Sequence, residues 1–309
     1  MADRCLVGGV FALVLVAGLA LPAAASASAS TTVPFDQRTW RMDPVAHPVP
    51  PATDAFAGPG REVAHAPDPG KDRFHLTAVR LWAYRQFLPK SKDADVLGVE
   101  LNSAWSWGRV SFSNITYFEF ADYARPIPGM PVGNESPGQG AATGISDILT
   151  AVLASPKRAH HGPHHWAAGI AAQFPSASDD TLGSGKWALG PAVEYEYEKG
   201  RFFAAFVALQ LWSCAGDADR KNVNMLMIKP MVTYELARHF KAVYMPYGIS
   251  VYWEKKSGEN IYLPLGGGLQ YDFRLWRQEL AVSLQFHHYV LRPTKGTENE
   301  IRFMLELDF

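Results

Sequence analysis

The chain ends in Ile301-Arg302-Phe303-Met304-Leu305-Glu306-Leu307-Asp308-Phe309, and two kinds of side chain alternate along this stretch. Every odd-numbered position is aliphatic or aromatic, whereas Arg302, Glu306 and Asp308 stand at even positions. Because successive side chains of a strand point to opposite faces, the stretch predicts a strand with one apolar and one charged face. The same split recurs in 186–198 and 277–291. Periodicity alone leaves open whether the apolar faces point inward, as in a soluble barrel, or outward into lipid.

Segments of this kind fill the chain after residue 72, rich in Val, Ile, Tyr, Phe and Trp and separated by turn residues. Soluble strands usually have ~5–6 residues, whereas a tilted membrane strand needs ~9–11. Most of the segments have the longer length, which favours a membrane barrel. We predict twelve strands: 74–87, 95–107, 110–120, 144–154, 165–174, 186–198, 201–213, 223–236, 239–253, 260–273, 277–291 and 299–309.

The connections between these segments alternate in length. Trp107-Gly108-Arg109 is a tight link, whereas 121–143, 175–185 and 214–222 are long and polar. Short turns at the periplasmic end and long loops at the outer end are typical of outer-membrane barrels. The link 155–164 is an exception to the alternation. The fold class we predict is all-β, a transmembrane antiparallel up-and-down β-barrel of about twelve strands.

The N-terminal region has a different character. Arg4 precedes an apolar run from Leu6 to Leu21, and small residues follow it to Ser30. This order predicts a secretory signal peptide rather than an uncleaved anchor helix, since the run is shorter than the ~20 residues of a membrane span. We therefore expect three parts: a signal peptide over 1–29, a proline-rich periplasmic arm or plug over 30–71, and the barrel over 72–309.

The overall composition narrows the classes of protein. The 309 residues include 29 basic and 30 acidic side chains, and the net charge of -1 argues against nucleic acid as a partner. The hydrophobic fraction of 48% excludes an intrinsically disordered chain. Cys5 lies in the predicted signal peptide, so its removal leaves Cys214 without an intramolecular disulfide.

One region carries a family resemblance. Phe174-Pro-Ser-Ala-Ser-Asp-Asp-Thr-Leu-Gly-Ser-Gly-Lys-Trp187, with Gly190-Pro191, resembles the outer-membrane barrel family named after the meta-pathway of phenol degradation. Stretch 212–224 matches the next loop of that family, and 144–148 and 264–268 match more weakly. The resemblance runs from about Gly144 to Phe309. It implies a channel for small apolar or aromatic compounds in the bacterial outer membrane, with no catalytic residues. We predict no cofactor.

The two loops that carry the resemblance contain charged residues of both signs. Carboxylates from both loops could form a hard oxygen site for Ca²⁺. The basic residues in the same loops favour a second interpretation, an ion-paired network that folds the loops inward, and we prefer it. The loops are our candidates for a constriction or recognition site on the substrate path, through Asp179, Asp180, Lys186, Asp217, Asp219 and Arg220.

A histidine-rich turn is a weaker candidate for a metal site. His160, His161, His164 and His165 could supply imidazole ligands to Zn, Ni or Cu. The turn contains Gly162 and Pro163 and offers no evident partners to fix the rings. We therefore favour a polar turn near lipid headgroups and predict no metal.

The predicted inner face of the strands carries both signs of charge. A ring of one sign would select ions, but a mixed set suits either a narrow wet channel or a salt-bridged interior without a channel. The residues we expect to face the lumen are Glu100, Glu194, Glu196, Lys229, Glu235, Gln270, Asp272, Arg274, Gln285, His287, Arg302 and Glu306.

Catalysis is not expected. Ser283 and His287 share a strand face, but at positions i and i+4 they lie ~13 Å apart, too far for a nucleophile and its base. The function we predict is passive passage of small apolar or aromatic compounds through the outer membrane. The alternatives are an occluded barrel with a structural or surface-interaction role, a lipid-modifying enzyme and a secreted soluble β protein. The expected partners are outer-membrane lipid, a small apolar solute and the barrel-insertion machinery, which would recognise Phe309.

Overall fold

The computed structural model describes residues 74–88, 93–123, 142–157 and 162–309. The predicted signal peptide and proline-rich arm lie outside these ranges. Nowhere in the described ranges does the chain form an apolar helix long enough to cross a membrane. The strands are β1 (His75–Phe87), β2 (Ala94–Trp107), β3 (Val110–Tyr123), β4 (Ala142–Ile145), β5 (Ile148–Pro156), β6 (His164–Phe174), β7 (Lys186–Lys199), β8 (Phe202–Gly216), β9 (Asn224–Ala237), β10 (Phe240–Tyr244), β11 (Ile249–Tyr252), β12 (Ile261–Leu275), β13 (Gln278–Leu291) and β14 (Asn299–Asp308).

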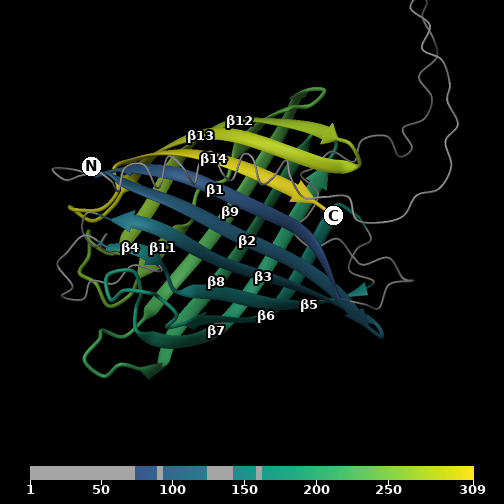
Figure 1. Cartoon of the computed structure of the whole chain (residues 1–309). Coiled ribbons are helices and arrows are strands. Elements are labelled where there is room, and N and C mark those ends of the chain that lie inside the picture. Colours follow the sequence, from purple (N-terminus) through teal and green to yellow (C-terminus); the bar gives the residue numbers. More distant parts are fainter. Residues whose placement is uncertain (1–73, 89–92, 124–141, 158–161) are drawn as a thin grey trace, which may run out of the picture. The chain divides into compact units, whose positions relative to one another are not determined.

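These segments form one closed antiparallel sheet (Figure 1). The first strand closes the barrel, because β1 pairs with β2 on one side and with β14 on the other. Strands β4 and β5 both pair with β3, and β10 and β11 both lie between β9 and β12. The fourteen segments therefore occupy twelve positions around the wall. The prediction of a twelve-stranded antiparallel barrel is confirmed.

Two-residue turns join four pairs of strands at one end of the barrel, β2–β3, β7–β8, β9–β10 and β12–β13, whereas the link from β5 to β6 is longer, the exception noted in the sequence. Gly108 and Gly200 each open such a turn with positive φ, at 60° and 61°, a backbone conformation that glycine adopts without steric cost. His239 and Trp276 adopt it in the turns β9–β10 and β12–β13, with φ of 70° and 56°. The links at the opposite end are longer, as the alternation of connection lengths predicts.

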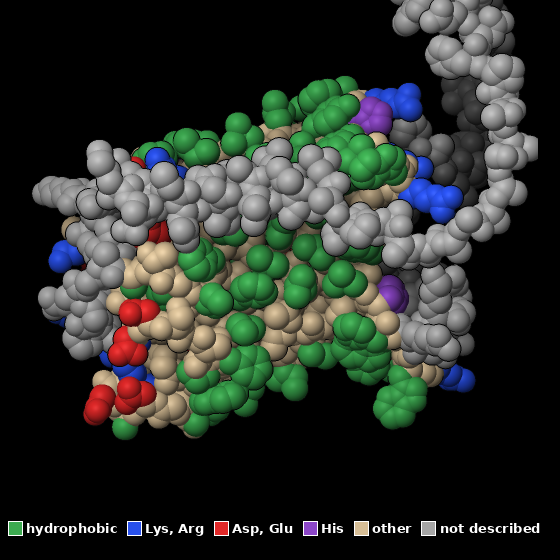
Figure 2. Space-filling model, in the orientation of Figure 1, with side chains coloured by type: hydrophobic (Ala, Val, Ile, Leu, Met, Phe, Trp, Pro, Cys, Tyr) green, Lys and Arg blue, Asp and Glu red, His purple; other side chains and the backbone are tan. Residues whose placement is uncertain are grey.

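The outer surface of the barrel is apolar. Leu269 on β12 and Leu284 on β13 are 57% and 60% exposed, and Ile301 on β14 is 44% exposed. In the view of Figure 2, hydrophobic side chains cover the middle of the wall, and charged side chains gather toward its two ends. Glu306 and Arg302, on the opposite face of β14, are 3% and 2% exposed. The barrel therefore has its apolar face outward, which suits acyl chains and not water.

Two predicted strands are interrupted. The predicted strand 239–253 breaks at Met245–Gly248, where Pro246 has no N–H to donate to the ladder. The predicted strand 144–154 begins two residues earlier and breaks at Ser146–Asp147. There the Ser146 hydroxyl accepts a bond from the backbone N–H of Glu119 at 3.0 Å. The break at Met245–Gly248 changes what lies inside the barrel, and the break at Ser146–Asp147 changes its outer rim.

Candidate functional site

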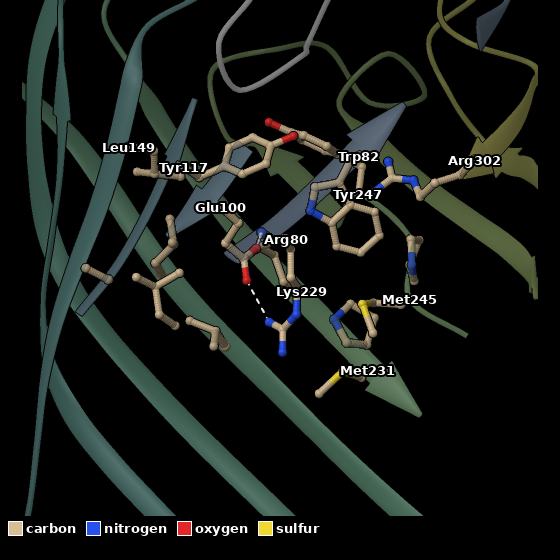
Figure 3. A pocket seen from close by; sticks show the side chains of 16 residues that line it. Arg80, Trp82, Glu100, Tyr117, Leu149, Lys229, Met231, Met245, Tyr247 and Arg302 are labelled. Carbon is tan, nitrogen blue, oxygen red and sulfur yellow. Dashed lines mark hydrogen bonds and ion pairs between the residues drawn. The ribbon is translucent and has the colours of Figure 1, made fainter. Parts of the chain in front are cut away.

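The barrel encloses a pocket that is partly open to solvent (Figure 3). Figure 3 shows Leu149 and Tyr117 on one side of the pocket and Tyr247, Met245 and Arg302 on the other. Most of the lining is apolar or aromatic. The lining residues are Arg80, Trp82, Glu100, Ile115, Tyr117, Leu149, Ala151, Val207, Leu209, Lys229, Pro230, Met231, Met245, Pro246, Tyr247 and Arg302.

One charged cluster of the lumen is centred on Arg80 of β1. Its two terminal nitrogens donate to Glu100 Oε1 at 2.7 Å and to Glu306 Oε1 at 2.8 Å. Strand register brings these groups together, because Arg80 lies opposite Glu100 on β2 and opposite Glu306 on β14. Glu100 also accepts bonds from Lys229 Nζ at 2.9 Å and from Asn102. Removing one partner of such a buried pair typically costs ~3–5 kcal/mol, so the cluster fixes these strands against one another.

The second cluster joins a buried cation to aromatic rings. The Arg302 guanidinium lies 4.5 Å from the ring centre of Tyr84 and 4.9 Å from that of Trp82, and its Nε donates to Glu300 at 2.8 Å. The ring centre of Tyr247 lies 5.8 Å from the same guanidinium. A cation over several ring faces is held by the quadrupole of each ring, an attraction that strengthens away from water.

The break between β10 and β11 supplies the pocket with side chains from the kinked segment Met245–Tyr247. Met245 and Tyr247 are buried, and Tyr247 packs on Tyr117 with ring centres 5.6 Å apart. The Met245 N–H donates to Gln285 Oε1 at 2.9 Å, which replaces a ladder bond with a bond to an inward-facing side chain. This segment places all three of its side chains in the pocket lining, where a regular strand would continue along the wall.

The predicted lumen residues fall into three groups. Lys229 and Glu235 are half-buried, and Arg274 is exposed near the end of β12, where it pairs with Glu279. The others are buried inside the wall: Glu100, Glu194, Glu196, Gln270, Asp272, Gln285, His287, Arg302 and Glu306. Of all twelve, only Glu100, Lys229 and Arg302 line the pocket. Sequence reasoning missed Arg80, Trp82, Tyr84 and Tyr117, although even-numbered positions of the predicted strand 74–87 carry the first three.

Glu194 on β7 has an unusual environment. Its side chain is 3% exposed, and among the described residues neither carboxylate oxygen has a hydrogen-bond partner. Strand register places Glu194 beside Val207 and Val207 beside Lys229. One apolar side chain therefore separates this carboxylate from the lysine of the pocket.

The predicted loop residues take part in a network between the two outer loops. Arg220 Nη2 donates to the backbone oxygens of Asp180 at 2.6 Å and Gly183 at 2.5 Å, and the Asp217 N–H donates to Gly185. Asp219 donates its N–H to the Asp217 carboxylate, and Lys186 is buried. No cluster of three or more metal-type ligands occurs in the described part of the chain. These contacts have the form of the loop-folding network, and a constriction made by these residues remains a prediction.

Asp179 stabilises a tight turn in the same loop. Its carboxylate accepts a bond from the backbone N–H of Thr181 at 2.7 Å. That hydrogen bond lowers the pKa of the Asp179 carboxyl, because it stabilises the ionised form.

Sequence reasoning missed Asp147 as the centre of the outer rim. This fully buried carboxylate accepts bonds from the Ser184 N–H and hydroxyl at 2.6 and 2.7 Å and from Gln173 Nε2 at 2.9 Å. It also accepts a bond from the N–H of Ala177. The loop 175–185 thereby covers the break between β4 and β5. The weak family match at 144–148 and the match at 174–187 were the available signals.

The histidine-rich turn and the pair Ser283 and His287, the two weaker candidates for a site, do not line the pocket. In the histidine-rich turn, His160 and His161 lie outside the described residues, whereas His164 and His165 belong to β6. His164 Nδ1 is 2.6 Å from the Tyr195 hydroxyl. Ser283 accepts a bond from Gln285 Nε2 at 3.1 Å, and Nδ1 of His287 lies 3.6 Å from Glu300. The two residues considered as a catalytic pair therefore have other partners.

A closed strand barrel satisfies every backbone group of its wall in lipid, and this one carries aliphatic side chains outside and charged ones inside. The protein is therefore a bacterial outer-membrane β-barrel with a channel-like architecture, as predicted.

The comparisons with known proteins agree with this class. No protein-family model and no curated protein sequence matches the chain. The fold is similar to the crystal structure of an outer membrane channel from Pseudomonas putida F1, with a TM-score of 0.51 and 12% identity over 78% of this chain and 98% of that one. At this identity the likeness shows the shared fold alone.

Two further solved structures match less well. The beta domain of the Bordetella autotransporter BrkA is 15% identical over 76% of this chain and 98% of that one, with a TM-score of 0.39. OmpT, an outer membrane protein of Vibrio cholerae, is 11% identical over 77% of this chain and all of its own, with a TM-score of 0.35. These scores are too low to support a closer relationship.

Proposed function

We propose that the protein is a passive channel for small apolar or aromatic compounds, as the resemblance to the phenol meta-pathway family also suggests. The pocket inside the barrel carries this proposal. Its walls combine Ile115, Leu149 and Leu209 with the rings of Trp82 and Tyr247. Apolar walls with a few placed polar groups are the usual lining of sites for small organic molecules. Passage would need no cofactor and no catalytic residue.

The position of the pocket supports passage rather than storage, because the pocket lies inside a wall that crosses the membrane. The similar fold of the Pseudomonas putida F1 outer membrane channel supports the same proposal.

The second candidate is an occluded barrel that acts through its outer loops, and one observation favours it. Part of the lumen is filled, since Gln86, His287 and Glu300 are fully buried and Tyr289 donates to Glu300 at 3.1 Å. In this candidate the filled interior closes the path through the barrel, and the outer loops carry the function.

Ion and solute flux distinguish the two candidates. The refolded full chain is reconstituted in planar bilayers and in liposomes, and single-channel conductance and swelling in benzyl alcohol solutions are measured. A channel gives discrete current steps and solute-dependent swelling. A folded barrel that is silent in both measurements contradicts the channel and supports the occluded barrel.

The C-terminal strand is the proposed signal for membrane insertion. Phe309 is 59% exposed, and its N–H pairs with the Thr77 carbonyl at 2.8 Å. This end of the chain is therefore accessible on the folded barrel, and insertion machinery would recognise the same residue before folding.

A further inference from the structure

We propose that the lumen pocket is a binding subsite for small organic monoanions with an apolar or aromatic body, and that Lys229 holds the anionic group. The inference deepens the proposed channel function and rests on it, because it names the class of solute that the pocket selects.

The kind of polar group around the pocket is the first argument. Arg80, Lys229 and Arg302 line it together with a single carboxylate, Glu100. Arg80 is neutralised by Glu306 and Arg302 by Glu300, each at 2.8 Å, and neither of these carboxylates belongs to the lining. The polar groups of the lining are therefore mainly N–H donors, which suits an acceptor such as a carboxylate better than a cation.

The accessibility of Lys229 is the second argument. Its side chain is 23% exposed, whereas those of Arg80 and Arg302 are 5% and 3% exposed. An ammonium group has three N–H donors, and among the described residues Lys229 Nζ has one hydrogen-bond acceptor, Glu100 at 2.9 Å. A ligand carboxylate can therefore take the remaining donors without displacing Glu100, which Arg80 and Asn102 also hold.

The walls around this cation are the third argument. Lys229 Nζ lies 4.5 Å from the ring centre of Tyr117, and Leu209, Met231 and Met245 face the same space. Thioether side chains adapt to ring-shaped ligands because they are unbranched and polarisable. An anion with a large apolar part gains from these walls, whereas chloride or phosphate does not.

A binding site for organic cations is the competing interpretation, because Glu194 is a buried carboxylate without a hydrogen-bond partner among the described residues. Glu194 does not line the pocket, however, and Val207 lies between it and Lys229 in the register. A cation bound at Glu194 would have to sit outside the space that the apolar walls form.

Three probes with the same ring separate these possibilities: benzoate, benzylammonium and benzyl alcohol. Binding of each to the refolded full chain in detergent is measured by calorimetry at neutral pH. We expect benzoate to bind at least about tenfold more tightly than the other two, which corresponds to about 1.4 kcal/mol. Equal affinities, or tighter binding of benzylammonium, would overturn the proposal.

Variants test the role of Lys229. Lys229→Met should weaken benzoate binding about tenfold and leave benzyl alcohol binding unchanged, whereas Lys229→Arg should retain most of the benzoate affinity. Lys241→Met is the matched control, since it removes another lumen lysine, whose Nζ lies 2.7 Å from Asp272 outside the pocket. Loss of benzoate binding in both lysine-to-methionine variants would also contradict the assignment. The heat-dependent gel shift of the barrel confirms that each variant is folded.

Conductance separates this inference from the channel itself. If the barrel does not conduct but binds benzoate through Lys229, the proposed subsite is supported and the proposed channel is contradicted. If the barrel conducts but shows no preference for benzoate, the channel is supported and the subsite is contradicted.

Discussion

At the scale of the residue, a few buried polar groups determine the geometry of the outer rim. Asp147 accepts four hydrogen bonds, from side chains and backbone groups of β6 and of the loop 175–185. A buried carboxylate of this kind is stabilised only while every donor remains in place. The loop is consequently attached to the wall at one point, and that point lies where the wall has no regular ladder.

Asp147→Asn tests this role. An amide NH₂ in place of either oxygen would face a donor instead of accepting from it, so we expect a loss of ~1–3 kcal/mol in unfolding free energy. The loop 175–185 should also become sensitive to protease. The measurements are urea unfolding in detergent micelles and limited proteolysis, with Asp219→Asn as the control because Asp219 is exposed in the neighbouring loop. An Asp147→Asn barrel as stable and as protease-resistant as the control would show that the loop is held by other contacts.

At the scale of the element, the two strand breaks matter more for function than the regular strands. The segment Met245–Tyr247 leaves the wall, and Tyr247 packs against Tyr117 and the Arg302 guanidinium in the lumen. Conductance of a narrow pore depends on its narrowest section. We therefore expect the segment, rather than the charged wall, to limit flux.

Tyr247→Ala should raise single-channel conductance about twofold or more, because it removes a ring of roughly the width of a small solute from the lumen. Tyr271→Ala removes an aromatic ring that is 40% exposed on the outer face of β12, and its conductance should match that of the unaltered protein. Equal conductance of the two variants would place the constriction elsewhere, and the loops that carry Asp180 and Arg220 would be the next candidates.

The strands could be predicted well from the sequence, because apolar and polar side chains alternate in a simple way along a membrane strand. Residues 301–309 face lipid and lumen in turn, and no other layer of protein obscures that pattern. The lumen residues of β1 were missed although the alternation holds there, because Trp82 and Tyr84 stand beside Arg80 on the inward face and aromatic rings suit either face. Pro246 was a readable signal of the break in the predicted strand 239–253. The partners of Asp147 come from residues far along the chain, and no local pattern indicates them.

At the scale of the whole molecule, the apolar outer face defines the surroundings of the barrel. Leu284 lies in the middle of β13, and Leu236 lies next to the turn end of β9; they are 60% and 51% exposed. Both side chains are thus at least half exposed, but they differ in their position along the wall. In water their substitution would have the same small effect, whereas in a bilayer the effect depends on depth.

Leu284→Arg should therefore destabilise the barrel in lipid by ~2–4 kcal/mol, and Leu236→Arg by only ~0–1 kcal/mol, because an arginine near the interface reaches water and headgroups. Unfolding in phospholipid bilayers is followed by the fraction that migrates as compact barrel on unheated gels. The difference between the two variants should shrink in a thin-bilayer lipid, in which the middle of β13 lies closer to the interface. Equal stabilities of the two variants in a bilayer of ordinary thickness would mean that β13 does not cross the hydrocarbon, and the lumen pocket would then not lie on a path through the membrane.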